Sequence, residues 1–293
     1  MALSPMMQQY MKIKEQYKDT LVFYRLGDFY EMFFDDAIVA SRELELTLTG
    51  RDCGLTERAP MCGVPFHAVE SYIAKLLEKG YKVAICEQTT KPGDQKGIVE
   101  RKIIREVTPG TKIDSEMLVD NVNNYLMSIY YSEGAAGVSW VDISTGEFNH
   151  VQLDAQVALN LNELLARVAP SEIICNGEMF ARSTELSIVK FGGVCPFSAF
   201  DESAFAYENA LECVKENLKD WKTLSDKKLC VCSSGALLEY LKRTQKRTLK
   251  HISRSVLEKS EDFMGTDASA RKTLELVSSY GENKNRGSLY WFL

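Results

Sequence analysis

Near its N-terminus the sequence reads Leu21-Val22-Phe23-Tyr24-Arg25-Leu26-Gly27-Asp28. The β-branched and aromatic residues of this stretch predict a strand, and the Gly-Asp pair predicts the turn that ends it. Before the strand, Ser4-Pro5 predicts a helix from Met6 to about Tyr17, because Ser is a favoured N-cap and Pro a favoured first helical residue. After the turn, apolar residues recur at helical spacing from Phe33 to about Leu46.

Helices and strands continue to alternate up to residue 110. A helix is expected over Ala68–Lys79 and a strand over Tyr81–Cys86. The turn sequence Thr108-Pro109-Gly110-Thr111 then closes the section. We therefore expect residues 1–110 to form one α/β domain, a mixed sheet with helices, in which Phe29 and Glu31 lie at the strand-to-helix junction.

Three strand-like segments open the next section, at residues 125–131, 136–143 and 147–151, and turn residues separate them. They predict an antiparallel meander. Helices over 156–168 and 203–217 then alternate with short strands over 172–175 and 229–232. Strands first and α/β alternation afterwards is the order of elements in ribonuclease-H-like folds, although a fold alone assigns no activity.

The third section of the sequence, with a different composition, begins near Gly235. A helix is expected from Ala236 through a basic run to about Leu249, and helical spacing returns from Phe263 onward. The sequence stops at Leu293 inside an apolar run, without a terminating signal. Since domains rarely end in this way, we expect residues 236–293 to begin a helical domain of a longer chain.

The net charge of −6 is unevenly distributed. Residues 1–110 hold 15 Lys+Arg and 16 Asp+Glu, residues 111–226 hold 7 and 18, and residues 227–293 hold 13 and 7. The acidic middle section would repel phosphate. Any contact with nucleic acid is therefore expected at the two ends of the chain.

The composition argues against membrane and secreted classes. No apolar run reaches the roughly 18 residues of a membrane span, and the first residues are polar where a signal peptide needs an apolar segment. The eight cysteines form no C-x-x-C pair and only three histidines accompany them, so neither a zinc site nor a disulfide scaffold is indicated. Cys230 and Cys232 are expected as buried thiols on one face of the short strand. We expect a cytoplasmic protein.

One segment carries a family resemblance. Arg25-Leu26-Gly27-Asp28-Phe29-Tyr30-Glu31-Met32-Phe33 resembles the signature of the mismatch-recognition domain of the MutS family of DNA mismatch-repair proteins, whose Phe-x-Glu is here Phe29-Tyr30-Glu31. Phe-x-Glu alone arises freely by chance. Further matching blocks follow the family's order and make the resemblance specific: Ser4–Tyr10, Cys62–Ala68, Val83–Gln88 and Val107–Thr111.

Similarity continues more weakly through the acidic section and sharpens at Leu238–Lys246, Phe263–Asp267 and Gly287–Trp291, with departures at Thr266, Ala270 and Thr273. The resemblance implies an α/β fold with three parts: a mixed-sheet mismatch-recognition domain at 1–110, a ribonuclease-H-like connector domain at 117–235, and the start of an all-α core domain at 236–293. The phosphate-cradling G-x-x-x-x-G-K-[ST] motif is absent from the sequence, so neither ATP hydrolysis nor a cofactor is expected of these residues.

The resemblance also implies a function. Phe29 would wedge into the minor groove and stack at a mispaired or unpaired base, and Glu31 would hydrogen-bond that base. The full-length protein would be a bacterial, nucleoid-associated homodimer and a DNA-dependent ATPase that uses ATP and Mg. Its partners would be mismatched double-stranded DNA and a MutL-type protein, the latter docked on the connector domain.

The chemistry of this pair suits a mispair sensor. Inserting a ring between base steps costs a few kcal/mol of unstacking, and base–aromatic stacking returns about 1–3 kcal/mol. A mispair stacks poorly and bends easily, so insertion costs less there. Glu31 is expected to weaken binding to every duplex by repelling phosphates, and to recover this only through a base hydrogen bond, for which protonation is one route.

Other readings of the sequence stay open. Lys242, Lys246 and Lys250 have the i, i+4 spacing of a helix face that binds phosphate, is solvated or contacts further domains of a longer chain. Asp142, with Glu147 nearby, lies where ribonuclease-H-like nucleases keep a metal-binding carboxylate, although no further carboxylates converge there. A protein-interaction role, as in meiotic relatives of the family, is the third reading, but those relatives generally lack Phe-x-Glu.

Overall fold

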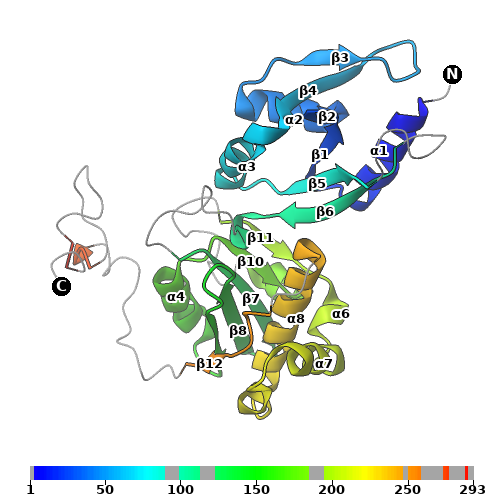
Figure 1. The fold of residues 1–293 in the computed structure, drawn as a ribbon. Coiled ribbons are helices and arrows are strands. Elements are labelled where there is room, and N and C mark those ends of the chain that lie inside the picture. Colours follow the sequence, from blue (N-terminus) through cyan, green and yellow to red (C-terminus); the bar gives the residue numbers. More distant parts are fainter. Residues whose placement is uncertain are drawn as a thin grey trace. The chain divides into compact units, whose positions relative to one another are not determined.

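The computed structural model describes residues 3–89, 99–112, 123–184, 195–246, 250–258, 273–276 and 288–289. The chain divides into two compact units, which are described separately. The first comprises residues 1–124 and 240–250, and the second comprises residues 125–239 and 251–293. Figure 1 shows the elements of both units.

The first unit is built on a sheet of six strands in the order β3-β4-β2-β1-β5-β6. Strands β1 and β5 pair in parallel and the other neighbours are antiparallel, so the sheet is mixed. The strands are β1 (Leu21–Leu26), β2 (Phe29–Phe33), β3 (Thr49–Arg51), β4 (Ala59–Pro65), β5 (Val83–Gln88) and β6 (Arg101–Val107). The accompanying helices are α1 (Pro5–Gln16), α2 (Phe34–Leu44) and α3 (Val69–Glu78).

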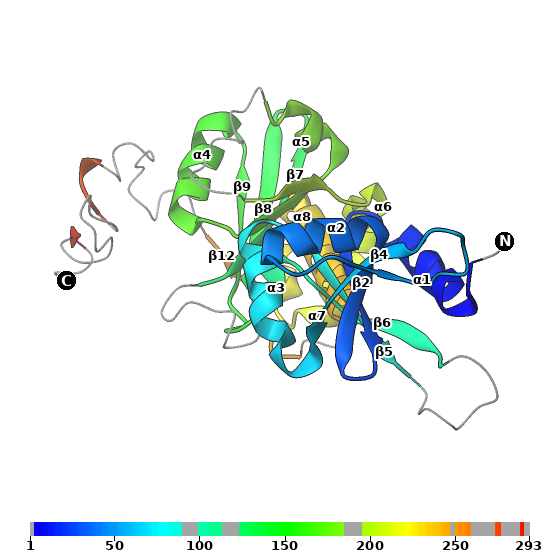
Figure 2. The same ribbon diagram turned by 90° about the horizontal axis from the view of Figure 1, so that it is seen from above.

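Helices cover both faces of this sheet (Figure 2). On one face α2 and α3 pack against alternate strand residues such as Phe23 and Met32. On the other face α1 packs against the intervening residues, and Tyr10 makes an edge-on contact with Phe33. Each strand therefore sends successive side chains into two different cores.

The structure corrects the expectation that Phe29 and Glu31 lie at a strand-to-helix junction. A separate strand, β2, follows the turn at Gly27-Asp28 and pairs with β1 as a hairpin. Its side chains alternate between exposed or half-buried at Phe29 and Glu31 and buried at Tyr30 and Met32. This period of two is that of a strand, and the sequence analysis missed it because an apolar helix follows without a break.

The second unit contains a sheet in the order β11-β10-β7-β8-β9-β12. Strands β7 (Tyr125–Ser132), β8 (Ala135–Asp142) and β9 (Phe148–Leu153) form an antiparallel meander, which confirms the prediction. Strands β10 (Glu172–Cys175), β11 (Phe197–Ala199) and β12 (Val256–Leu257) each pair in parallel with a neighbour. The expected α/β class with two mixed sheets is confirmed.

The helices of the second unit are α4 (Val157–Val168), α5 (Gly177–Arg182), α6 (Glu202–Phe205), α7 (Tyr207–Asn217) and α8 (Lys228–Gln245), of which the residues from Tyr240 onward belong to the first unit. On one face of the sheet, α4 and α5 pack on the core that contains Met127 and Trp140. On the other face the α8 backbone at Leu229 comes so close to β8 that a Cβ at position 137 would overlap it, so only Gly137 fits. The Ser139 hydroxyl is 2.7 Å and 2.8 Å from those of Ser233 and Ser234 on α8.

The prediction of a strand over 229–232 is wrong. These residues lie in the first turns of α8, where Cys230, Val231 and Cys232 are all buried. A short segment that is buried on every side shows no helical period, so its spacing cannot separate helix from strand. The helix expected over 203–217 is also interrupted, because Ala206 has extended backbone angles between α6 and α7.

The sequence analysis placed the start of a third domain at residue 236. Residues 236–245 form the second part of α8, residues 250–251 a turn, and residues 256–257 strand β12. The helical region expected from residue 263 onward lies almost entirely outside the described residues. The predicted domain boundaries stay predictions.

Two further observations concern composition. None of the helices in the described part of the chain is both long and apolar enough to cross a membrane. All eight cysteines are free, and six of them are buried. Burial raises the pKa of the Cys86, Cys175 and Cys230 thiols to about 12, so these residues are protonated, unreactive thiols.

Candidate nucleic-acid interface

Phe29 is the first residue of β2 and is 48% exposed. The hairpin reaches it through Gly27, whose φ of +57° favours a residue without a Cβ. Across the sheet its neighbours are Leu26 on β1 and Pro65 on β4. Phe33, on the same face of the same strand, is fully buried under α1. Only the ring at the hairpin end of β2 is therefore open to a ligand.

Glu31 lies two residues further along β2 and faces the same side as Phe29. Its side chain is only 14% exposed, and its Oε2 accepts a hydrogen bond from Nη1 of Arg51 on β3. Gly63 is opposite Glu31 on β4, and a Cβ there would come within 3.4 Å of the Glu31 Cγ. The glycine leaves room for the carboxylate to extend across β4.

The opposite face of the hairpin is held by Arg25. Its guanidinium lies 4.0 Å from the centre of the Phe66 ring and 5.4 Å from that of Tyr30. The Tyr30 hydroxyl donates to Glu87, whose carboxylate is also 3.7 Å from Arg25. Phe66 is 41% exposed, and its backbone N–H donates to the Asp28 carbonyl. These contacts fix the turn that carries Phe29.

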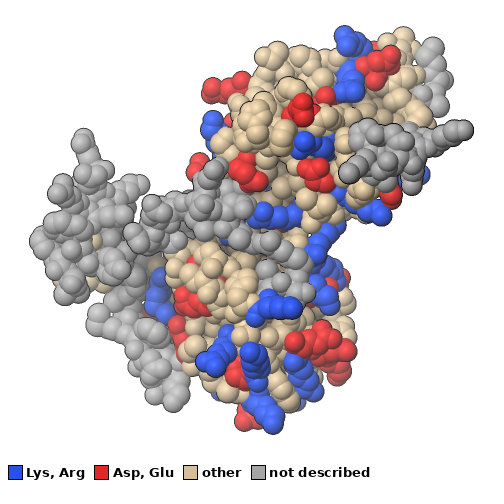
Figure 3. Space-filling view, in the orientation of Figure 1, with Lys and Arg blue, Asp and Glu red and all other residues tan. Residues whose placement is uncertain are grey.

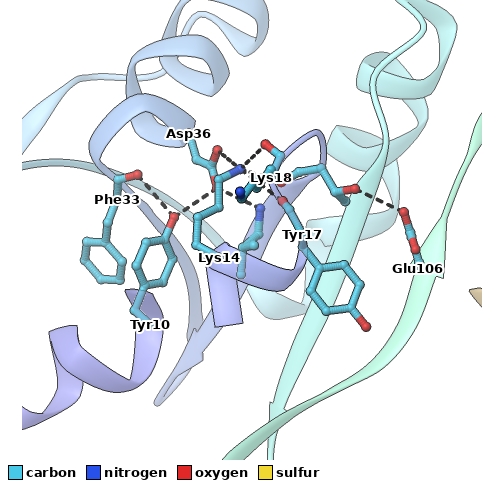
Figure 4. Close-up of polar contacts among 9 residues, drawn as sticks. Tyr10, Lys14, Tyr17, Lys18, Phe33, Asp36 and Glu106 are labelled. Carbon is cyan, nitrogen blue, oxygen red and sulfur yellow. Dashed lines mark hydrogen bonds and ion pairs between the residues drawn. The ribbon is translucent and has the colours of Figure 1, made fainter. Parts of the chain in front are cut away.

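A buried polar network ties α1 to the start of the hairpin (Figure 4). The carboxylate of Asp36 accepts hydrogen bonds from the Tyr10 hydroxyl at 2.9 Å and the Val22 N–H at 3.0 Å, and it pairs with the Lys14 ammonium at 2.8 Å. The ammonium also donates to the backbone carbonyl of Thr20 at 2.8 Å. Because the buried carboxylate is compensated by a cation and two further donors, α1, α2 and β1 are held together beneath the hairpin.

The surface of the first unit carries both signs of charge. In the face shown in Figure 3, its Lys and Arg side chains lie among Asp and Glu and form no continuous basic area. This agrees with the nearly balanced charge of residues 1–110. This face offers no broad phosphate-binding surface.

The basic run does not form the expected helical face. Helix α8 ends at Gln245, and Lys246 follows it with a φ of +50°. The Lys246 ammonium donates to the Tyr17 hydroxyl at 2.9 Å and to the Ile103 carbonyl at 3.0 Å. The prediction that Lys242, Lys246 and Lys250 line one side of a helix is therefore wrong, and a phosphate contact by any of them stays a prediction.

Asp142, the carboxylate considered as a nuclease metal ligand, is hydrogen-bonded within its own turn. Asp142 is buried at the end of β8, and its Oδ1 accepts from the backbone N–H and the hydroxyl of Ser144 at 2.8 Å and 2.6 Å. Glu147 accepts from the Tyr125 hydroxyl and the Asn149 amide. Among the described residues, no three His, Cys, Asp or Glu side chains gather as a metal site. Asp142 stabilises the turn between β8 and β9.

Sequence reasoning missed two notable residues. Arg51 lies twenty positions from Glu31, and only the β3-β4-β2 order brings the two together. His150 lies on β9, is fully buried, and neither of its ring nitrogens is hydrogen-bonded within the described residues. No short motif in the sequence marks either residue.

The fold and the site define a two-unit α/β protein that presents an exposed aromatic ring and a half-buried, arginine-paired carboxylate on one hairpin. The chain belongs to the MutS family: residues 4–116 match the family model of MutS domain I, and residues 124–253 match that of MutS domain II. The resemblance seen in the sequence is confirmed.

Similar proteins named DNA mismatch repair protein MutS occur in several bacteria. That of Acetivibrio thermocellus is 50% identical over 100% of this chain, that of Ruminiclostridium cellulolyticum 48% over 99%, and that of Lachnoclostridium phytofermentans 46% over 99%. The chain covers 34%, 34% and 31% of these relatives. It thus spans about a third of their length.

Proposed function

We propose that this chain is the mispair-sensing part of a longer DNA mismatch-repair protein, and that Phe29 enters the minor groove and stacks at a mispaired or unpaired base. The observation that carries the proposal is the exposure of Phe29 at the end of a braced hairpin, while Phe23 and Phe33 in the same sheet are buried. An exposed aromatic ring on a rigid element can wedge between base steps without first leaving a core.

Selectivity in this proposal comes from the DNA and not from base identity. A paired duplex resists unstacking by a few kcal/mol, whereas a mispair has already lost part of its stacking and bends more easily. The ring gains about 1–3 kcal/mol of stacking at either site. Insertion is therefore favoured where the duplex is already weakened, whichever bases form the mispair.

Glu31 adds a second means of distinguishing mispaired from paired duplex. Its carboxylate lies beside Phe29 on the same face of β2 and repels the phosphates of any duplex. A hydrogen bond to a displaced base compensates for that repulsion only at a mispair. Glu31 thereby reduces binding to correctly paired DNA.

The rest of the proposal follows from family membership. The complete protein would be a homodimer and a DNA-dependent ATPase using ATP and Mg, with those activities outside these 293 residues. A MutL-type protein would dock on the second unit. In the cell the protein would be cytoplasmic and bound at the nucleoid.

A competition assay on the complete protein tests the proposal. Phe29→Ala should remove most of the preference for a duplex with one mispair over the same duplex fully paired, about tenfold or more given the stacking energy lost. Phe180→Ala, which removes a ring that is 46% exposed in the second unit, should leave the preference unchanged. Retention of the full preference by Phe29→Ala would overturn the proposal.

A further inference from the structure

The carboxylate of Glu31 is bonded on one side only. Arg51 holds its Oε2, and no hydrogen bond to its Oε1 is formed within the described residues. Arg51 reaches it from the edge strand β3, on the far side of β4. On β4 the residue opposite Glu31 is Gly63, where a Cβ would lie 3.4 Å from the Glu31 Cγ. The result is a carboxylate with one anchored oxygen and one open oxygen.

The anchored carboxylate lies next to Phe29. The two residues are separated by one position on the same face of β2, which places their Cα atoms about 7 Å apart. Two base steps also span about 7 Å of duplex. The ring and the open oxygen can therefore contact neighbouring bases of one distorted site. An ionised carboxylate only accepts hydrogen bonds, so the open oxygen suits an N–H group of a displaced base.

We propose that Arg51 is a positioning residue for Glu31 in mispair recognition, an inference that rests on the proposed function. Its guanidinium has two effects. It offsets the repulsion between Glu31 and the phosphates when DNA approaches, and it fixes the rotamer that directs Oε1 toward the site of Phe29. Without Arg51, the Glu31 carboxylate still repels the phosphates, but its side chain is no longer held in the rotamer that can bond the base.

The competing explanation is that Arg51 simply contacts a phosphate. A phosphate contact strengthens binding to paired and mispaired duplex alike, and its loss lowers the dependence of affinity on salt concentration. A positioning residue instead changes the ratio of the two affinities, and it does so only while Glu31 is present. The preference ratio is therefore the quantity that separates the two roles.

The test is a double-mutant cycle on the complete protein. The preference ratio, the Kd for paired duplex divided by the Kd for the same duplex with one mispair, is measured for wild type, Arg51→Met, Glu31→Gln and the double variant. Arg51→Met keeps the apolar stem of the side chain and removes its charge. Arg58→Met is the matched control, because Arg58 precedes β4 on the same hairpin, is exposed and forms no bond to Glu31.

We expect Arg51→Met to lower the ratio roughly five- to tenfold in the presence of Glu31, the change that a coupling of about 1 kcal/mol produces. In the Glu31→Gln background the same substitution should change the ratio less than about twofold. Arg51→Lys should restore most of the wild-type ratio, since it keeps a cation at the anchored oxygen. Thermal unfolding of each variant shows whether strand β3 has been lost, and Arg51→Gln, which also removes the charge, serves as the test variant if Arg51→Met does not fold.

Two results would overturn the inference. One is an unchanged ratio in Arg51→Met with both affinities reduced equally, which is the signature of a phosphate contact. The other is an equal loss of ratio with and without Glu31. Phe29→Ala measured in parallel distinguishes the two proposals: if it loses the preference while the cycle shows no coupling, only the role of Arg51 is wrong. If it keeps the preference, the proposed function fails and this inference with it.

Discussion

The Tyr10 hydroxyl donates a 2.9 Å hydrogen bond to the Asp36 carboxylate, and both side chains are buried (Figure 4). The bond joins α1 to α2, and the same carboxylate accepts from the Val22 N–H on β1. Burial and the neighbouring Asp36 charge raise the pKa of Tyr10, so its hydroxyl stays protonated and available as a donor. The hairpin that carries Phe29 starts directly from this anchored strand.

Tyr10→Phe should destabilise the first unit by about 1–2 kcal/mol, because a buried carboxylate loses one of its donors. Hydrogen exchange measured by mass spectrometry should show faster exchange of amides in α1 and β1. Tyr72→Phe is the control, since the Tyr72 hydroxyl forms no hydrogen bond within the described residues. Equal exchange in wild type and Tyr10→Phe would show that the network contributes nothing to stability.

The buried His150 is expected to make the stability of the second unit depend on pH. Burial lowers the pKa of His150 from 6.5 to about 4, against a smaller opposing effect of Asp220. The unfolded chain therefore binds this proton before the folded chain does, so the stabilisation is complete above about pH 6.5 and is lost as the pH falls toward 4. The loss is on the order of 3 kcal/mol.

Urea unfolding followed by tryptophan fluorescence measures this effect, because residues 1–124 contain no tryptophan whereas Trp140 and Trp221 belong to the second unit. His150→Leu should flatten the change in unfolding free energy between pH 6.5 and 4.5, whereas replacing the exposed His67 with Leu should not. If the unfolding free energy of His150→Leu depends on pH as steeply as that of wild type, a group other than His150 takes up the proton.

Gly137→Ala should destabilise the second unit by about 3 kcal/mol, because the new methyl group would overlap the backbone of α8 at Leu229. Gly134→Ala is a graded comparison: its φ of +85° makes a side chain strained, but nothing lies within 4 Å. That substitution should cost only about 1 kcal/mol. The same fluorescence-detected unfolding checks both, and equal losses would mean that α8 does not lie directly on β8.

Glu31→Gln in the complete protein should bind fully paired duplex more tightly, about threefold at moderate salt, because one carboxylate near the phosphates is removed and Arg51 is freed. Asp28→Asn, on the same hairpin, controls for the loss of a negative charge that is not paired to Arg51. Direct titration of labelled paired duplex measures the affinity. An unchanged affinity would rule out a role for Glu31 in suppressing background binding.

Local patterns in the sequence predicted much of the fold. The strand at 21–26, the first helix and the meander over 125–153 each show their own period and end at clear turn residues. The prediction of two elements failed for the same physical reason. Strand β2 merges into α2 without a break, and the start of α8 is buried on every side, so neither displays a local period that identifies it.

The site was partly predictable. Phe29 and Glu31 stand out through the ordered blocks around them, and the structure adds that the first is exposed and the second half-buried. Arg51 was not predictable, because its contact with Glu31 depends on the order of strands β3, β4 and β2 in the sheet. Such cross-strand relationships leave no trace in local composition.

The central claim is that the ring at position 29 touches the mispaired base. Replacing Phe29 with p-benzoylphenylalanine, a photoreactive residue of related shape, in the complete protein and mapping the crosslinked nucleotide tests it directly. The account predicts crosslinks concentrated at the mispair and its adjoining base, and few on fully paired duplex or from the same residue placed at Phe180. Crosslinks from position 29 that are equally frequent on paired DNA, or spread evenly along the duplex, would contradict it.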